Sequence, residues 1–235
     1  MTAMLSIRGI DKRFGALPVL TDATFDVAEG SITGLIGPNG SGKTTLFDII
    51  TGYRAPDGGS VLFARSEIIG LKPYQLARRG LIRTFQLTRV FKGLTVLENL
   101  LVCDVSPTAE EASDRALEML DFVRLTALAD REAAALSYGQ QKLLEIAQVL
   151  MLDPSMLLLD EPMAGINPGL ADQIIEHLQA LRAGGKTLLL IEHNLSVITT
   201  LCDKLLVLNA GSIIAEGRPE EVIKDRNVRE AFLGS

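Results

Sequence analysis

A glycine-rich loop near the start of the chain has the residue types and spacing that bind phosphate. Residues 37–44 read Gly-Pro-Asn-Gly-Ser-Gly-Lys-Thr and fit the pattern G-x-x-x-x-G-K-[ST]. An apolar segment (31–36) precedes the loop, and residues 43–50 follow it with helical spacing. In a strand-loop-helix unit, the backbone N–H groups of the loop and the helix start surround phosphate oxygens. The loop therefore predicts a site for a nucleoside triphosphate.

Two side chains at the end of this loop add chemistry to the backbone. Lys43 is expected to reach the β- and γ-phosphates, and the Thr44 hydroxyl to ligate Mg²⁺. A glycine-rich turn with a solvated lysine is the alternative. The residues predicted to contact the nucleotide here are Gly37, Pro38, Asn39, Gly40, Ser41, Gly42, Lys43, Thr44 and Thr45.

Two carboxylates end an apolar segment in the middle of the chain. Residues 156–161 read Met-Leu-Leu-Leu-Asp-Glu. Because successive side chains of a strand point to opposite faces, Asp160 and Glu161 are expected to point in different directions. We expect Asp160 to hold Mg²⁺ and Glu161 to polarise the attacking water, the two tasks that phosphoryl transfer requires. Alternatively, the strand merely ends in solvated charges.

A second helix start has no acidic side chain in its first turn. Residues 136–140 read Leu-Ser-Tyr-Gly-Gln, and amphipathic spacing continues through 141–152. Ser137 is expected to cap this helix, with Gly139 near its first turn. Such a helix start can bind a γ-phosphate, although an ordinary capped helix is the alternative. One chain cannot easily grip a nucleotide with both helix starts, so two copies facing each other are expected to share it.

The elements that must position these residues alternate between strands and helices. A period-two pattern over 5–27 predicts a small β region, and the stretch 87–135 reads as helical. Thr95 with Glu98, and Thr108 with Glu111, match the capping box that begins a helix. Further strands are predicted at 60–63, 81–85, 156–159, 187–191 and 205–208. The expected fold is an α/β body with a parallel sheet covered on both faces and an inserted helical subdomain.

Composition excludes several classes of protein. The 235 residues are 47% hydrophobic and 22% charged, which excludes disorder and supports a sizeable core. With 23 Lys and Arg against 29 Asp and Glu, the net charge of −6 makes nucleic acid a poor partner. Cys103 and Cys202 lack a metal-ligand or C-x-x-C spacing, which predicts a reducing cytoplasm. No apolar run reaches the roughly 20 residues of a spanning helix.

The order of these motifs resembles that of ATP-binding cassette (ABC) ATPases over nearly the whole chain. The shared features are the loop from Gly37 to Thr45, Gln86, the segments 136–140, 157–161 and 164–167, and His193. Details are similar to the ATPase subunits of branched-chain amino acid importers, in residues 83–86, 91–100, 136–145, 164–168, 216–219 and 231–234. The resemblance implies a P-loop NTPase fold with a parallel-sheet core, an N-terminal antiparallel β region and the helical insert. It implies a single domain, 1–235, with core segments 1–86 and 136–235 and the insert at 87–135.

The resemblance also implies roles for individual residues. Phe14 matches the aromatic residue that stacks on adenine, Gln86 the glutamine that links metal and water to the helical subdomain, and His193 the histidine that contacts the γ-phosphate. Read alone, these three residues fit a core aromatic, a surface amide and a strand-end histidine. Another histidine, His177, is expected to be exposed, as is the acidic pair at 110–111.

The roles that the resemblance assigns across the site fall into three sets. Catalysis is assigned to Lys43, Gln86, Glu161 and His193. The metal ligands are Thr44, Gln86 and Asp160. The nucleotide of the opposite protomer is contacted by Ser137, Gly139 and Gln140.

Three positions depart from the commoner ABC pattern. Tyr138 stands where glycine is usual, as in the amino acid importer subgroup. Asn167 stands where aspartate is usual and removes a charge near the partner's site. Phe14 replaces a tyrosine but still offers a stacking face.

The resemblance implies an ATPase that couples hydrolysis of ATP, with Mg²⁺, to uptake of branched-chain or related hydrophobic amino acids. The expected partners are membrane-spanning permease subunits, a second ATPase chain, identical or not, and indirectly a solute-binding protein. The expected place is the cytoplasmic face of the membrane, with residues 87–101 as the contact surface. Other cargo (urea, another amino acid, lipid export) and a soluble ABC protein acting on DNA or ribosomes are the alternatives. A GTPase is disfavoured because no Asn-Lys-x-Asp element is present.

Overall fold

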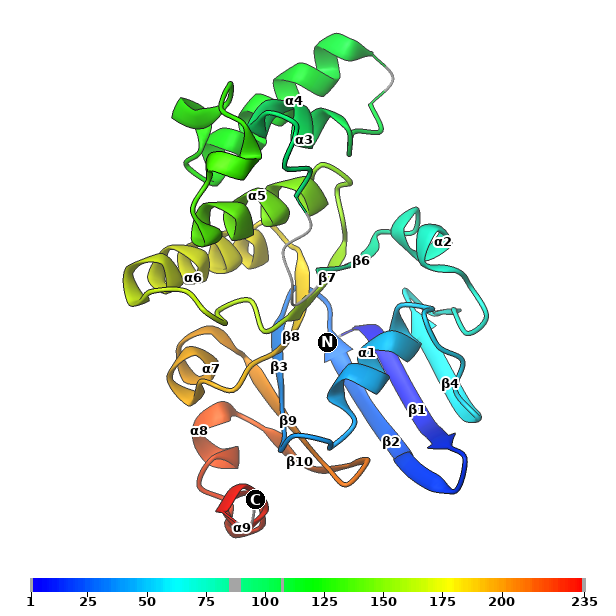
Figure 1. Cartoon of the computed structure of the whole chain (residues 1–235). Helices are drawn as coiled ribbons and strands as arrows, with labels where there is room; N and C mark the ends of the chain where they lie inside the picture. Colours follow the sequence, from blue (N-terminus) through cyan, green and yellow to red (C-terminus); the bar gives the residue numbers. More distant parts are fainter. Residues whose placement is uncertain (1, 85–89, 107, 234–235) are drawn as a thin grey trace.

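A six-stranded sheet forms the centre of the molecule (Figure 1). The computed structural model describes residues 2–84, 90–106 and 108–233, with side chains as far as residue 230. The strands, in spatial order, are β10 (Ser212–Gly217), β9 (Lys204–Asn209), β3 (Ile32–Ile36), β8 (Thr187–Ile191), β7 (Met156–Asp160) and β6 (Leu81–Arg83). All neighbours are parallel except β10, which runs antiparallel to β9. The predicted parallel sheet is confirmed.

Both faces of the sheet are buried at its centre, where every residue of β3, β8 and β7 is buried and most are apolar. In β7, Leu157 and Leu159 belong to one hydrophobic core, whereas Met156 and Leu158 belong to another. The first core lies beneath the helices that follow the insert, and the second beneath α1 (Lys43–Ile50) and the N-terminal sheet. Packing on both sides fixes the ends of the strands, from which the candidate site residues extend.

The N-terminal β region is a separate antiparallel sheet, as predicted. Its spatial order is β2 (Leu17–Ala28), β1 (Ala3–Phe14), β4 (Gly58–Phe63) and β5 (Ser66–Glu67). The β1–β2 hairpin pairs Phe14 with Leu17 and so places Phe14 at the tip of the hairpin. In Figure 1, α1 lies between this sheet and the central sheet.

Three helices form a group at one end of the molecule (Figure 1). They are α3 (Val96–Leu101), α4 (Ala109–Phe122) and α5 (Tyr138–Leu150), which pack on one another. The predicted capping box of α3 is complete, because Thr95 and Glu98 each accept a backbone N–H of the other. Thr108 caps α4 in one direction only among the described residues, accepting the N–H of Glu111.

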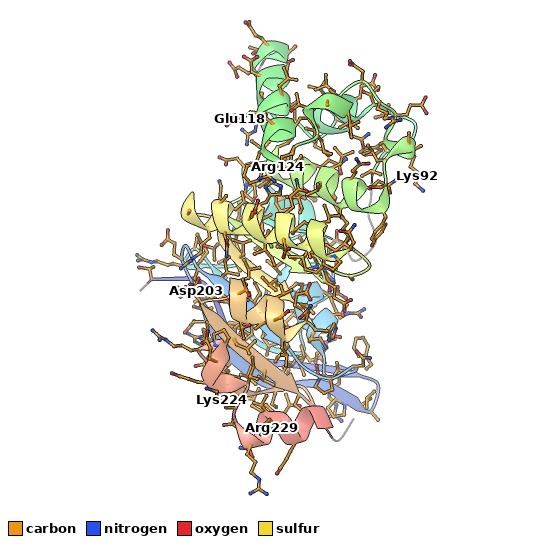
Figure 2. The ribbon with its side chains drawn as sticks, turned by 90° about the vertical axis from the view of Figure 1, so that its left-hand side faces the viewer. Lys92, Glu118, Arg124, Asp203, Lys224 and Arg229 are labelled. Carbon is orange, nitrogen blue, oxygen red and sulfur yellow. The ribbon has the colours of Figure 1, made fainter. Side chains whose placement is uncertain are left out.

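The remaining helices cover the central sheet and its ends. They are α2 (Pro73–Ala77), α6 (Pro168–Ala183), α7 (Leu195–Leu201), α8 (Pro219–Val222) and α9 (Arg226–Leu233). Short 3-10 turns occupy Thr126–Leu128 and Ala133–Ala135. Figure 2 shows Lys92, Glu118 and Arg124 near the helical end, and Lys224 and Arg229 at the opposite end. Among the described helices, none has the length and apolar character needed to cross a bilayer.

The prediction that His177 is exposed is wrong. His177 is only 5% exposed, and its ring lies 4.9 Å from the ring of Phe122 between α6 and α4. The Nε2 atom is buried and has no hydrogen-bond partner among the described residues. Burial therefore lowers the pKa of His177, and the nearby positive charge of Arg124 lowers it further, against an opposing effect of Glu176. The acidic pair at 110–111 is exposed, as predicted.

Candidate functional site

The loop before α1 has the backbone shape that a phosphate site requires. Gly40 and Gly42 have φ angles of 79° and 108°, a region that side chains other than glycine rarely adopt. A Cβ atom on Gly37 would lie 2.1 Å from the carbonyl oxygen of Leu208, so only glycine fits there. The first N–H groups of a helix have no intrahelical acceptor, and at α1 no side chain of the described residues caps them.

Lys43 lies inside this loop rather than in solvent. Its ammonium donates to the carbonyl oxygens of Gly37 at 2.7 Å and Pro38 at 3.0 Å, and the residue is 7% exposed. Burial lowers the pKa of Lys43 below its ordinary value, while Glu161 and Asp160 oppose part of the shift. The alternative of a solvated lysine is therefore wrong, because Lys43 is buried and its ammonium is bound to two carbonyl oxygens.

One buried hydroxyl in the loop has a donor to offer. Ser41 Oγ is buried and has no hydrogen-bond partner in the described part of the chain. A buried polar group without a partner is costly, and a phosphate oxygen would accept a hydrogen bond from this hydroxyl. Thr44 next to Lys43 is exposed, and Thr45 is half-buried. Uncapped N–H groups, an ammonium and an orphan hydroxyl together fit a phosphate group.

Asp160 ends β7 and is held by a buried arginine. Its Oδ2 accepts a hydrogen bond from Arg83 at 2.7 Å, and the two side chains are 9% and 6% exposed. The other carboxylate oxygen, Oδ1, makes no hydrogen bond among the described residues. Asp160 can therefore offer one oxygen to a cation while the other stays bound to Arg83.

Glu161 and His193 form a pair beside Asp160. His193 Nε2 lies 2.9 Å from Glu161 Oε1. Glu161 lies just past the end of β7 with a φ of 50°, and its N–H donates to Ile191 O at 3.0 Å. Glu161 thus does not continue the alternation of the strand, because the backbone turns into a left-handed conformation after Asp160. The prediction that strand alternation separates the two carboxylates is corrected on that ground.

Glu192 is a site residue that the sequence reasoning missed. It is 4% exposed, and its carboxylate accepts the N–H of Met163 at 3.0 Å and of His193 at 3.1 Å. Burial raises the pKa of Glu192, although these backbone hydrogen bonds lower it in part. Glu192 therefore ties the chain after Glu161 to the chain that carries His193. Its position between an apolar strand and His193 was the available signal.

Phe14 is exposed and carries a cation on its ring. The residue is 41% exposed, which excludes the core-aromatic alternative. The guanidinium carbon of Arg54 lies 4.6 Å from the ring centroid, a cation–π contact. Arg54 is a further residue that the sequence reasoning did not select.

The start of α5 is closed by its own side chains. Ser137 Oγ accepts the N–H of Gln140 at 3.3 Å, and Gln140 Oε1 accepts the N–H of Ser137 at 2.9 Å. Gly139 packs against α6, since an added Cβ would lie 1.9 Å from a methyl carbon of Leu170. Asn167 caps α6 by accepting the N–H of Leu170 at 3.0 Å. The unusual Asn167 thus has a structural task that aspartate would also perform.

The structure gathers some of the predicted residues and separates others. Lys43, Asp160, Glu161 and His193 converge at the ends of the parallel strands. Among the described residues, no hydrogen bond or ion pair joins the start of α5 to the loop at 37–45. Gln86 lies outside the described residues.

Comparison with known proteins identifies the class. The family model described as "ABC transporter" matches residues 20–164, and the model described as "Branched-chain amino acid ATP-binding cassette transporter" matches residues 212–235. The chain therefore belongs to the ABC transporter family and has the nucleotide-binding fold of its ATPases. The resemblance predicted from the sequence is confirmed.

Relatives and solved structures match the chain over its whole length. A probable branched-chain amino acid transport ATP-binding protein, LivG, from Methanocaldococcus jannaschii is 41% identical, with 98% of this chain and 97% of that protein covered. The ADP conformation of an ATP-binding cassette of an ABC transporter superposes with a TM-score of 0.93 at 40% identity, covering 100% of both chains. A dimeric ATP-binding cassette bound to ADP and Pi has a TM-score of 0.81 at 26% identity, covering 92% of this chain and 99% of that one.

Proposed function

We propose that this chain is the ATP-hydrolysing subunit of an importer for branched-chain or related hydrophobic amino acids. The observation that carries the proposal is the match to a protein named for branched-chain amino acid transport, 41% identical over 98% of the chain. The match of residues 212–235 to a model specific for that transporter class supports it, because it lies outside the nucleotide loop.

ATP binds with its phosphates in the loop at 37–45. The loop N–H groups and the orphan hydroxyl of Ser41 donate to phosphate oxygens, and the Lys43 ammonium moves from its two carbonyl acceptors to the β- and γ-phosphates. Adenine stacks on the exposed ring of Phe14. The negative charge of the phosphates is matched by the positive end of α1.

Hydrolysis uses the pair formed by Glu161 and His193. Glu161 orients the attacking water by accepting its hydrogen bond, and His193 holds the carboxylate at 2.9 Å and contacts the γ-phosphate. Gln86 would link the water to the helical insert. The two carboxylates have different partners, Arg83 for Asp160 and His193 for Glu161, which suits them to separate tasks.

The residues at the ends of the strands also fit Mg²⁺. The exposed hydroxyl of Thr44 and the Oδ1 atom of Asp160 would hold the ion, with Gln86 as a third ligand. Mg²⁺ is usually held by one or two protein groups together with substrate phosphates, and here it would neutralise charge on the β- and γ-phosphates.

Two ATPase chains close around ATP, either as identical copies or as a pair of related chains. The loop at 37–45 of one chain and residues Ser137, Gly139 and Gln140 of the other clasp the nucleotide. The likeness to a dimeric cassette bound to ADP and Pi supports this arrangement. Binding energy closes the dimer only to the extent that ATP prefers the closed over the open form.

The chain acts at the cytoplasmic face of the membrane on permease subunits, with a solute-binding protein as an indirect partner. Residues 87–101 are the proposed contact with the permease, within the insert at 87–135 of a single domain. The part of this segment that the structure describes is tied to α5, since Asn99 bonds the backbone of Phe91 and also receives a hydrogen bond from Gln148. Motion of the segment is thereby transmitted to the helix that begins at Ser137.

An uptake assay tests the proposed function. In the source organism, deletion of the gene should abolish accumulation of labelled leucine, and the wild-type gene, but not a Lys43→Ala variant, should restore it. Affinity purification of the tagged chain from membranes should recover permease subunits. If deletion left leucine uptake unchanged but abolished uptake of urea or another amino acid, that compound would be the cargo instead. Co-purification with ribosomes or DNA would reject the transporter role.

A further inference from the structure

A buried arginine bridges the two elements that the nucleotide site depends on. Arg83 lies at the end of the edge strand β6. Its Nη1 donates a hydrogen bond to Asp48 Oδ1 at 2.6 Å, and its Nη2 donates one to Asp160 Oδ2 at 2.7 Å. Asp48 is on α1, which begins at the phosphate loop, and Asp160 ends β7. The Arg83 side chain is 6% exposed and lies 5.5 Å from the Phe47 ring.

The bridge fixes the orientation of Asp160. Each carboxylate accepts a hydrogen bond from a different terminal nitrogen of the same planar guanidinium. The position of the Asp160 Oδ2 atom is therefore fixed relative to α1. Asp48 is itself anchored on its other oxygen by Arg54 at 3.8 Å. The Oδ1 atom of Asp160 is left for another ligand in the part of the chain that the structure describes.

We infer that Arg83 is a positioning residue that aims the free oxygen of Asp160 at the metal ion of the bound nucleotide. The inference rests on the proposed function, because it presumes that Mg²⁺ and ATP bind at this site. The inferred role of Arg83 is to orient Asp160 rather than to contact the nucleotide or the metal. Arg83 also ends β6, and the N–H of the next residue, Thr84, donates to Leu158 O at 2.9 Å.

A residue that only held β6 and α1 together, a purely structural bracket, would affect nucleotide binding differently from a positioning residue. Loss of a bracket would weaken nucleotide binding equally with and without metal. Loss of positioning would weaken nucleotide binding only when the metal is present, because only the metal contacts Asp160. Residues that orient a metal ligand typically account for about 10- to 100-fold in metal affinity.

Calorimetric titration of the full-length chain with a non-hydrolysable ATP analogue separates the two roles. The quantity measured is the ratio of analogue affinity in Mg²⁺ to that in EDTA. Arg83→Met should lower this ratio about 10- to 100-fold, and Arg83→Lys should lower it less. The affinity in EDTA should stay within about threefold of wild type. Arg8→Met, which removes an exposed arginine paired with Asp26, is the matched control and should leave the ratio unchanged.

A double-mutant cycle identifies Asp160 as the route. In an Asp160→Asn background, Arg83→Met should lower the ratio no further. If Arg83→Met does not fold, because Asp160 loses its partner and Asp48 keeps only the 3.8 Å contact with Arg54, the double variant Arg83→Met with Asp48→Leu removes one of the two carboxylates and is measured instead.

The possible outcomes distinguish this inference from the proposed function. An unchanged ratio, or equal losses in Mg²⁺ and EDTA, overturns the positioning role and leaves the proposed function standing. If the wild-type chain binds no analogue in either buffer, the proposed function fails and the inference fails with it.

Discussion

Two helix starts in this chain differ in how they treat their free N–H groups. At α1 no side chain in the described part of the chain caps the helix, and the preceding Gly42 has a left-handed backbone conformation. At α5 the side chains of Ser137 and Gln140 close a capping box. The first helix start therefore keeps its donors for a ligand, whereas the second satisfies part of its donors internally.

The difference shows that one chain holds a complete phosphate site at the start of α1. At the start of α5 it offers only a contact to the nucleotide of a second chain. Lys43, Asp160, Glu161 and His193 already converge at the α1 start. A nucleotide can still receive hydrogen bonds from the Ser137 hydroxyl, which only accepts within the capping box, and from the N–H groups of Tyr138 and Gly139. ATP binding is thus expected to begin at α1, with α5 of the partner joining later.

The largest expected effect is on turnover. Glu161→Gln should reduce ATP hydrolysis about 10²- to 10⁴-fold, because the amide cannot accept the proton of the attacking water as the carboxylate does. Nucleotide affinity should remain within about twofold, measured by calorimetry, since the phosphate loop is intact. Wild-type turnover in this variant would remove Glu161 from its assigned role.

Replacement of Lys43 should weaken binding at the α1 start directly. Lys43→Ala removes the only side-chain ammonium that the structure describes within the loop at 37–45, and a charged hydrogen bond is worth about 1.5–3 kcal/mol. ATP affinity should fall about 10- to 100-fold in equilibrium titration. Lys92→Ala, at the exposed position labelled in Figure 2, is the control and should bind normally. Equal affinity in both variants would contradict the phosphate site.

Two glycine substitutions sharpen the contrast between the helix starts. Gly139→Ala brings a Cβ against the mobile end of Leu170, an overpacking worth about 1–3 kcal/mol of unfolding free energy. Gly42→Ala instead meets both the Val19 carbonyl oxygen and Cδ2 of Leu20 at 2.8 Å, with φ at 108°. In chemical denaturation, Leu170→Ala should relieve most of the cost of Gly139→Ala. Leu20→Ala should leave most of the cost of Gly42→Ala in place, because the Val19 carbonyl oxygen and the φ angle remain. Equal rescue of the two alanine variants would contradict this difference between the glycines.

The smallest effect concerns pH and the helical end of the molecule. Because the folded-state pKa of His177 is lowered, the unfolded chain binds a proton below about pH 6.5 that the folded chain does not. His177 therefore makes stability fall as pH decreases from about 6.5, by at most about 1.4 kcal/mol per pH unit. His177→Leu should lack this part of the pH dependence in denaturation at pH 5.5 and 7.5. Parallel curves for both proteins would contradict the buried, neutral histidine.

Sequence reasoning located the parts of the site that are encoded locally. The loop at 37–45, the carboxylates that end β7 and the histidine after β8 each lie at a junction of an apolar strand with a turn. Residues whose role depends on distant partners escaped it. Arg83 meets Asp48 and Asp160 across separations of 35 and 77 residues, and Glu192 meets Met163 across 29.

The errors have the same origin. His177 lies between a charged and an apolar neighbour, and only the packing of α6 on α4 decides that its ring is buried against Phe122. Glu161 lies beyond the end of β7 in a left-handed backbone conformation, which no period-two pattern predicts.

The sequence by itself determined the strands, the order of the motifs and the phosphate loop, because hydrophobic period and glycine placement act on neighbouring residues. Only the tertiary structure decided the pairing of charges: which carboxylate Arg83 holds, which backbone groups Glu192 binds and which ring Arg54 covers. Those choices depend on distances between elements far apart in the chain, and hydrogen bonds and ion pairs lose their strength within a few ångströms.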